Sequence, residues 1–220
     1  MPHSAAADPV ARKAARLRSI SWAILTFFAL GTGLGALRYA LPRVPFPAPL
    51  PNFFARHGWL VGHAVSSGVA LLAGPWQFLS SLRRRSLSFH RWAGRVYCAA
   101  VLAGWLLSLP IAAHAQTGRV ASAGFLTLGA AWIAATAAGY FNARRGLVLR
   151  HREWMTRSYA LTAAAITLRI YLPIMTMAGV PFSTSYPLVA WICWIPNLLF
   201  AEWLVRRPAF GRSRLDGFQN

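Results

Sequence analysis

The chain has 220 residues, of which 56% are hydrophobic and only four are Asp or Glu, and its formal net charge is +19. This combination excludes an ordinary soluble domain and is typical of a protein that crosses a membrane several times. A basic chain suggests a nucleic-acid partner by default. Here the basic residues lie between apolar runs of membrane-spanning length, so we expect no nucleic acid.

Six apolar segments follow one another, at about 19–40, 58–80, 92–113, 120–143, 154–178 and 185–205. Each has roughly 20 residues or more, which is enough for a helix to cross a hydrocarbon core about 30 Å thick. We interpret the first as an anchor, because its apolar run is longer than the core of a signal peptide and no small-residue cleavage site follows it. The predicted fold is an all-α bundle of six transmembrane helices over residues 18–206, between cytoplasmic tails at 1–17 and 207–220.

Arginines indicate how these helices are oriented. They gather before the first apolar segment, after the second and the fourth, and at the C-terminus, whereas the alternate loops carry few. Positive charge marks the cytoplasmic side, so both termini are expected in the cytoplasm. The proline-rich segment 41–51 is then an external loop. The arginine and alanine bias is common in bacteria, so we expect a multi-pass protein of the bacterial cytoplasmic (inner) membrane, surrounded by membrane lipid.

A short element occurs twice in the chain. His90-Arg-Trp-Ala-Gly-Arg-Val-Tyr97 returns as His151-Arg-Glu-Trp-Met-Thr-Arg-Ser-Tyr159, and each copy follows an arginine cluster and opens an apolar segment. The repeat predicts two related hairpins, spans 2–3 and spans 4–5, arranged in the same sense about an axis along the membrane normal. His90 and His151 would lie near that axis on the cytoplasmic side. The other members of the two copies expected to contact a ligand are Tyr97, Tyr159, Arg95 and Arg157.

Polar side chains inside apolar segments are costly against lipid and are therefore candidates for function. His63 and Gln77 belong to a stripe of polar and small residues whose spacing places them on one helix face, toward the bundle interior. The spacing in the fifth segment likewise places His151, Thr162, Arg169 and Thr176 on one face. Arg169 lies roughly 15 Å from the outer end of its helix, and no carboxylate shares its depth. It is expected to bind backbone carbonyls, water or neutral side chains, or to recognise a carboxylate or phosphate.

The histidines fall into two layers in this arrangement. His63 and His114 lie toward the outer side with Arg169, and His90 and His151 lie toward the inner side. Such layers suit haem b, because paired imidazoles hold the iron and arginines neutralise the propionates. The outer set also suits Cu(I), which we rank behind haem b.

Four motifs between residues 63 and 173 carry a family resemblance. They are Gly74-Pro-Trp-Gln-Phe78, the repeat element His90–Tyr97, Trp154–Thr162 and Thr167–Pro173. Together they resemble a bacterial membrane-protein family catalogued as domain of unknown function 2306. The resemblance covers about half of the chain and implies a predicted multi-pass membrane protein without an established activity. The layered histidines resemble, more weakly, the cytochrome b561 class of six-helix haem proteins.

Three functions stay open on the sequence alone. The first is a haem- or metal-binding redox protein of the membrane. The second is a carrier or binder of a small anion or lipid headgroup, with Arg169 and Gln77 lining an internal cavity. The third is a structural or assembly role without a cofactor. No set of nucleophile, base and carboxylate for a hydrolase is visible, but a haem-dependent oxidoreductase leaves the enzyme question open. The sequence identifies no redox partner, small-molecule substrate or oligomeric state.

Overall fold

The computed structural model describes residues 9–41 and 55–207, and the chain forms helices throughout these two ranges. The tails at 1–8 and 208–220 and most of the predicted external loop lie outside the described residues, whereas residues 9–17 are part of the first helix. The elements are α1 (Pro9–Leu37), η1 (Arg38–Ala40), α3 (His57–Gln77), α4 (Ser80–Arg85), α5 (Leu87–Ala113), α6 (Arg119–Arg144), α7 (Val148–Thr162), α8 (Ala164–Met177), α9 (Phe182–Ile192) and α10 (Ile195–Arg206).

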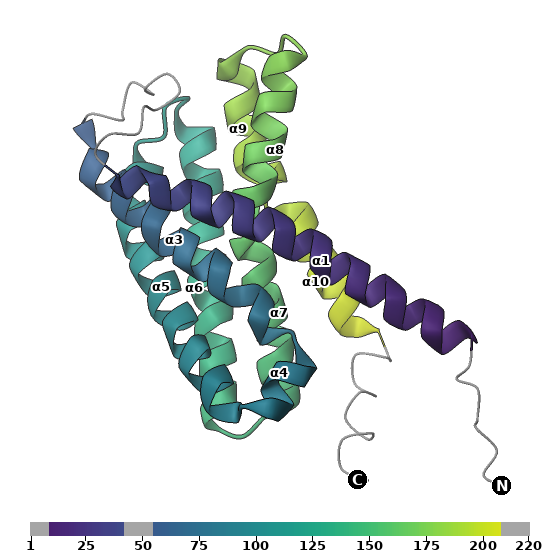
Figure 1. Cartoon of the computed structure of the whole chain (residues 1–220). Coiled ribbons are helices and arrows are strands. Elements are labelled where there is room, and N and C mark those ends of the chain that lie inside the picture. The colour runs from purple at the N-terminus through teal and green to yellow at the C-terminus, as the bar shows by residue number, and fades with distance from the viewer. Residues whose placement is uncertain (1–8, 42–54, 208–220) are drawn as a thin grey trace, which may run out of the picture.

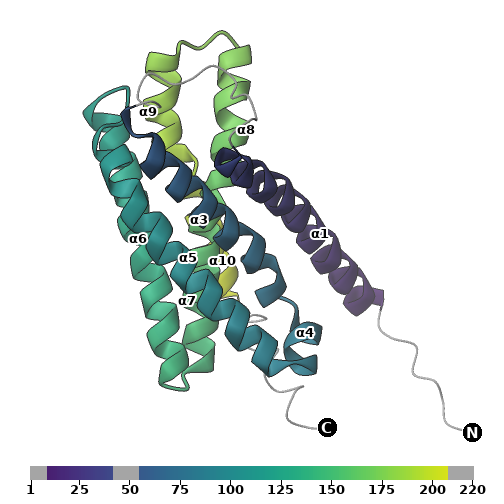
Figure 2. The same ribbon diagram turned by 60° about the vertical axis from the view of Figure 1, so that its left-hand side comes forward.

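The long helices run up and down beside one another (Figure 1). Helices α3 and α5 form one antiparallel pair and α6 and α7 form another, with α5 against α6 and α3 against α7. These pairs correspond to the predicted spans 2–3 and 4–5, whereas their relation by an axis along the membrane normal stays a prediction. Helix α1 crosses the outside of α3 and leans away from the bundle toward its Pro9 end (Figure 2). Its first residue, the last turn of α10 and the turn between α6 and α7 lie at the same end of the molecule.

Five helical segments among the described residues are long and apolar enough to cross a membrane. They are Ser19–Ala40, Leu87–Ala113, Arg119–Arg144, Val148–Met177 and Phe182–Arg206. Helix α3 is not among them, because its polar stripe and its glycines lower its mean hydropathy. Five of the six predicted spans are thus candidate membrane-spanning segments in the structure. That α3 is the sixth span stays a prediction, as does the orientation of the chain.

Tyr159 of α7 contacts α3 closely. Gly74 has no side chain, and the ring of Tyr159 occupies the place where its Cβ would be. The next residue, Pro75, has no N–H and cannot donate to the Leu71 carbonyl one turn earlier. The hydroxyl of Tyr159 donates to that carbonyl instead, at 3.1 Å. The Gly-Pro pair therefore creates both the space and the acceptor that fix α7 on α3.

Small residues on α1 allow it to approach α3 closely. A Cβ at Gly33 would lie 2.7 Å from the side chain of Leu72 and 3.2 Å from the carbonyl of Gly68. The indole of Trp22 donates to the carbonyl of Pro75 at 3.0 Å. Contacts between small residues are the usual means by which helices pack in a membrane, so this face of α1 has a structural role.

The last two candidate spans are each interrupted near the middle. Helix α7 ends at Thr162 and α8 begins at Ala164, and α9 and α10 are separated by residues 193–194. The interruptions lie side by side, since the amide of Asn197 donates to Cys193 at 3.1 Å and to Ala160 at 3.3 Å, and Thr167 donates to Cys193. A one-residue interruption at Ala163 therefore lies within the helix face predicted for residues 151–176.

We predict that Gly74→Ala destabilises the protein by about 1–3 kcal/mol, because overpacking forces Tyr159 out of its position. The measurement is thermal unfolding of the detergent-purified protein. Gly31→Ala is the matched control, because a Cβ there meets nothing within 4 Å. Equal stability of the two variants would contradict the contact.

Candidate functional site

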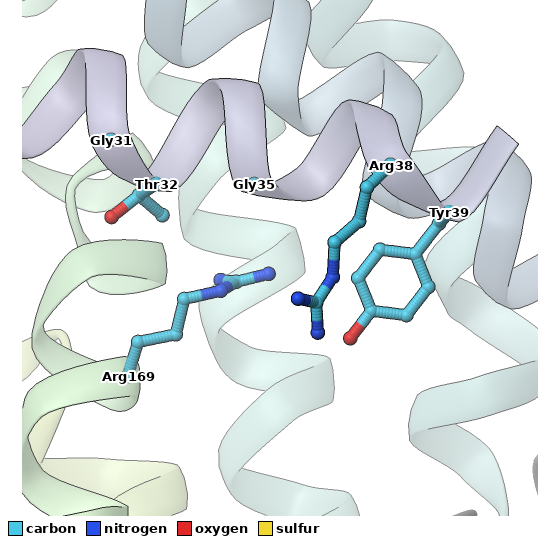
Figure 3. Close-up of a pocket in the computed structure, with 6 residues that line it drawn as sticks. All are labelled: Gly31, Thr32, Gly35, Arg38, Tyr39 and Arg169. Atoms are coloured by element: carbon cyan, nitrogen blue, oxygen red, sulfur yellow. The ribbon is translucent and has the colours of Figure 1, made fainter. Parts of the chain in front are cut away.

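A cavity of about 280 Å³ lies between α1 and α8. Figure 3 shows the side chain of Arg169 reaching from α8 toward Arg38, which descends from the end of α1 beside Tyr39. None of the described residues that line it is acidic, and two are arginines. The lining residues are Gly31, Thr32, Gly35, Arg38, Tyr39 and Arg169.

The two arginines share the cavity without a carboxylate. Arg169 donates one N–H to the carbonyl of Ala165 in its own helix at 2.9 Å, and a guanidinium has five N–H donors in all. Arg38 has its guanidinium carbon 5.9 Å from the centre of the Tyr39 ring. The two guanidinium groups are close enough to repel each other electrostatically. Their fields therefore combine in the cavity and favour an anion between them.

The carboxylates in the described part of the chain are placed elsewhere. Glu202 on α10 binds the side chains of Arg157 at 2.8 Å and Arg206 at 2.7 Å. Glu153 lies 16 residues before Arg169, on the far side of the interruption at Ala163. The sequence-based expectation that no carboxylate shares the depth of Arg169 agrees with this arrangement.

Two glycines keep the cavity open. A Cβ built at Gly31 or at Gly35 meets nothing within 4 Å, in contrast to Gly33, which faces α3. Gly31 and Gly35 are four residues apart on one face of α1, and Arg38 follows three residues later, at the start of η1. Sequence reasoning missed this arrangement, because it did not consider Arg38 as a site residue. The Gly-x-x-x-Gly-x-x-Arg spacing is the signal that could have found it.

His63 lies on α3. Its Nδ1 donates to the carbonyl of Gly104 on α5 at 2.8 Å, which leaves Nε2 as the unprotonated ring nitrogen. Arg169 is close enough to His63 to act on it electrostatically. His114, the other member of the predicted outer layer, bonds instead to the carbonyl of Pro110 in its own helix at 3.0 Å. The structure thus brings His63 and Arg169 near each other. His114 lies at the C-terminal end of α5, ten residues beyond the Gly104 that His63 contacts.

The inner histidines lie near each other, as the repeat predicts. His90 and His151 are close enough to interact electrostatically, and Nδ1 of His151 donates to the carbonyl of Gly139 at 2.9 Å. Arg95 lies exposed on α5. Arg157 is bound to Glu202, with its guanidinium carbon 4.8 Å from the centre of the Trp154 ring. Across residues 9–41 and 55–207, no group of three or more His, Cys, Asp or Glu side chains could hold a metal ion.

The two repeated tyrosines lie in the core. The hydroxyl of Tyr97 is 2.7 Å from Ser158 Oγ and 2.8 Å from Thr162 Oγ1. The hydroxyl of Tyr159 donates to Leu71. Both hydroxyls therefore have protein partners, and their contact with a ligand stays a prediction.

Sequence reasoning missed the rest of this buried network. Trp132 Nε1 donates to Thr162 Oγ1 at 2.8 Å, and Thr136 Oγ1 is 2.7 Å from Ser158 Oγ. The Ser and Thr hydroxyls inside apolar segments are the sequence signal that could have identified this network.

Gln77, in contrast to these hydroxyls, has a buried Nε2 without a hydrogen-bond partner among the described residues, and it is not among the residues that line the cavity.

A family model for predicted membrane proteins, DUF2306, matches residues 60–205, which is more than half of the chain. The chain belongs to this family. The match to DUF2306 begins within α3 and ends in α10, so it contains Arg169 but not α1, which supplies the opposite wall of the cavity. No curated protein and no solved structure matches the chain. The weaker likeness to cytochrome b561 proteins is not supported by these comparisons. A DUF2306 family description states no activity, so function has to be argued from the site itself.

We predict that Tyr159→Phe costs about 1–3 kcal/mol of stability, because the buried Leu71 carbonyl then lacks a donor. In a Pro75→Ala background the same change should cost less, because the alanine would supply the backbone N–H that proline lacks. Denaturant or thermal unfolding of the four proteins measures this coupling. Equal costs in the two backgrounds would show that the tyrosine hydroxyl does not serve the carbonyl.

Proposed function

We propose that this multi-pass membrane protein binds an oxyanion, a phosphate or a carboxylate, between Arg38 and Arg169. The observation that carries the proposal is the pair of guanidinium groups facing one cavity whose lining includes no acidic residue. A guanidinium presents a planar fork of donors that matches both oxyanions in two-point contact. Thr32 and Tyr39, which also line the cavity, have hydroxyls that suit the remaining oxygen atoms.

The energetics of the membrane support an anionic occupant. An arginine at the centre of a membrane-spanning helix costs on the order of 3 kcal/mol or more unless it is paired or hydrated, and it costs less toward the helix ends. Two neighbouring arginines add mutual repulsion to this cost. A bound oxyanion removes net charge and accepts hydrogen bonds that are stronger than in water. Binding of an oxyanion therefore offsets the free-energy cost of holding the two arginines in the membrane.

We propose the bacterial inner membrane as the location of the protein, with both termini in the cytoplasm, because the distribution of its arginines favours that orientation.

We predict that Arg169→Gln weakens the binding of radiolabelled inorganic phosphate to the detergent-purified protein at least tenfold. A charge-assisted hydrogen bond contributes about 1.5–3 kcal/mol, and about 1.4 kcal/mol corresponds to a tenfold change. Arg169→Lys should restore part of the affinity, since it keeps the charge but not the fork. Arg119→Gln is the control, because that exposed arginine does not line the cavity. Unchanged phosphate binding by Arg169→Gln, or an equal loss of phosphate binding in Arg119→Gln, would contradict the proposal.

A second candidate function is a haem-binding redox protein at the inner histidine pair. It is favoured by the proximity of His90 to His151 and by the Gly139 carbonyl, which holds Nδ1 of His151 and leaves Nε2 available. Carbonyl-bound imidazoles of this kind are common among metal ligands. A reduced-minus-oxidised visible spectrum of protein produced with haem supplied tests it. Haem bands that disappear in His90→Ala and His151→Ala would support this candidate, and a featureless spectrum would remove it.

A further inference from the structure

We infer that the anion bound between Arg38 and Arg169 is the headgroup of an anionic membrane phospholipid, whose acyl chain lies along α1. This inference rests on the proposed function and adds the class of ligand. It depends on three features of α1: open space at two glycines, an exposed apolar face that continues from them, and the length of that face.

The first feature is the open space. Gly31 and Gly35 line the cavity, and neither packs against another part of the described chain. Glycine lowers helix stability relative to alanine, and here that effect is not offset by close helix packing. Gly33 differs, because it lies against Leu72 and Gly68. The two glycines therefore form a shallow trough that suits a ligand.

The second feature is the apolar face. Ile24, Phe27 and Phe28 precede Gly31 by seven, four and three residues, which places them on the same side of the helix. Their exposed fractions are 54%, 73% and 42%. An apolar face toward lipid is ordinary in a membrane helix, but this one leads directly to two arginines without a carboxylate. A phospholipid has the matching order of groups, with an anion at one end and a hydrocarbon chain behind it.

The third feature is length. Arg38 lies close to the end of the candidate span Ser19–Ala40, at the depth where headgroups begin. Ten residues of helix separate Arg38 from Phe28, which is roughly 15 Å. Half of a hydrocarbon core about 30 Å thick is the same length. A chain whose headgroup is bound at Arg38 therefore ends beside the two phenylalanines.

Native mass spectrometry of the detergent-purified full chain tests this inference. Phosphatidylglycerol is the lipid probe, diacylglycerol with the same chains is the uncharged control, and inorganic phosphate binding is measured in parallel. We expect phosphatidylglycerol to be retained at least tenfold better than diacylglycerol and to bind more tightly than phosphate. Phe27→Asn should reduce lipid retention at least tenfold and leave phosphate binding unchanged, because Phe27 belongs to the exposed apolar face of α1 and does not line the cavity. Phe200→Asn is the matched control, since Phe200 on α10 is also exposed, at 61%, and lies outside this cavity.

The outcomes separate the two proposals. If phosphate binding depends on Arg169 but phosphatidylglycerol binds no more tightly than phosphate, or Phe27→Asn retains the lipid, the lipid inference is overturned and the oxyanion site stands. If neither phosphate nor lipid binding responds to Arg169→Gln, both fail. Lipid retention that is lost in both Arg169→Gln and Phe27→Asn, with normal retention in Phe200→Asn, supports the inference.

Discussion

The carbonyl group of Leu71 is the constraint on which the arrangement of this bundle depends. Backbone groups in a membrane have no water to bind, so each one needs a partner within the protein. Pro75 removes the usual donor to this carbonyl, and Tyr159 supplies one from α7. The carbonyl of Pro75 in turn accepts the indole N–H of Trp22 from α1. One turn of α3 therefore fixes α1 on one side and α7 on the other, and α8 follows from α7.

The same rule explains the polar residues of the core. The hydroxyls of Tyr97, Ser158 and Thr162 bind one another, and the two helix interruptions are joined by Asn197 and Thr167. These groups have partners inside the protein, so they specify which helices meet and in which register. Their chemistry is used for packing, which is why polarity inside an apolar segment does not by itself identify a ligand site.

The cavity between α1 and α8 differs from the core in this respect. Arg38 and Arg169 bring charge into an apolar setting, the carboxylates of the described chain lie elsewhere, and two glycines leave the space beside them open. A protein that needed these residues only for packing would fill the space or supply a counter-ion. The oxyanion and lipid proposals both follow from these two arginines, which face one cavity whose described lining holds no carboxylate.

The sequence by itself determined that the chain is a helical membrane protein of the DUF2306 family, and it singled out Arg169, because length, hydropathy and the cost of burying charge are local properties. It also predicted the two hairpins and the proximity of His90 to His151 through the repeated element. The tertiary structure decided that Tyr97 and Tyr159 bind protein groups, that Arg157 pairs with Glu202, and that the partner of Arg169 across the cavity is Arg38. These pairings join residues 45 to 131 positions apart in the chain. Helical periodicity gives the face on which a residue lies, whereas the neighbour on that face depends on how helices pack, and here the packing depends on Gly74, Pro75 and Gly33.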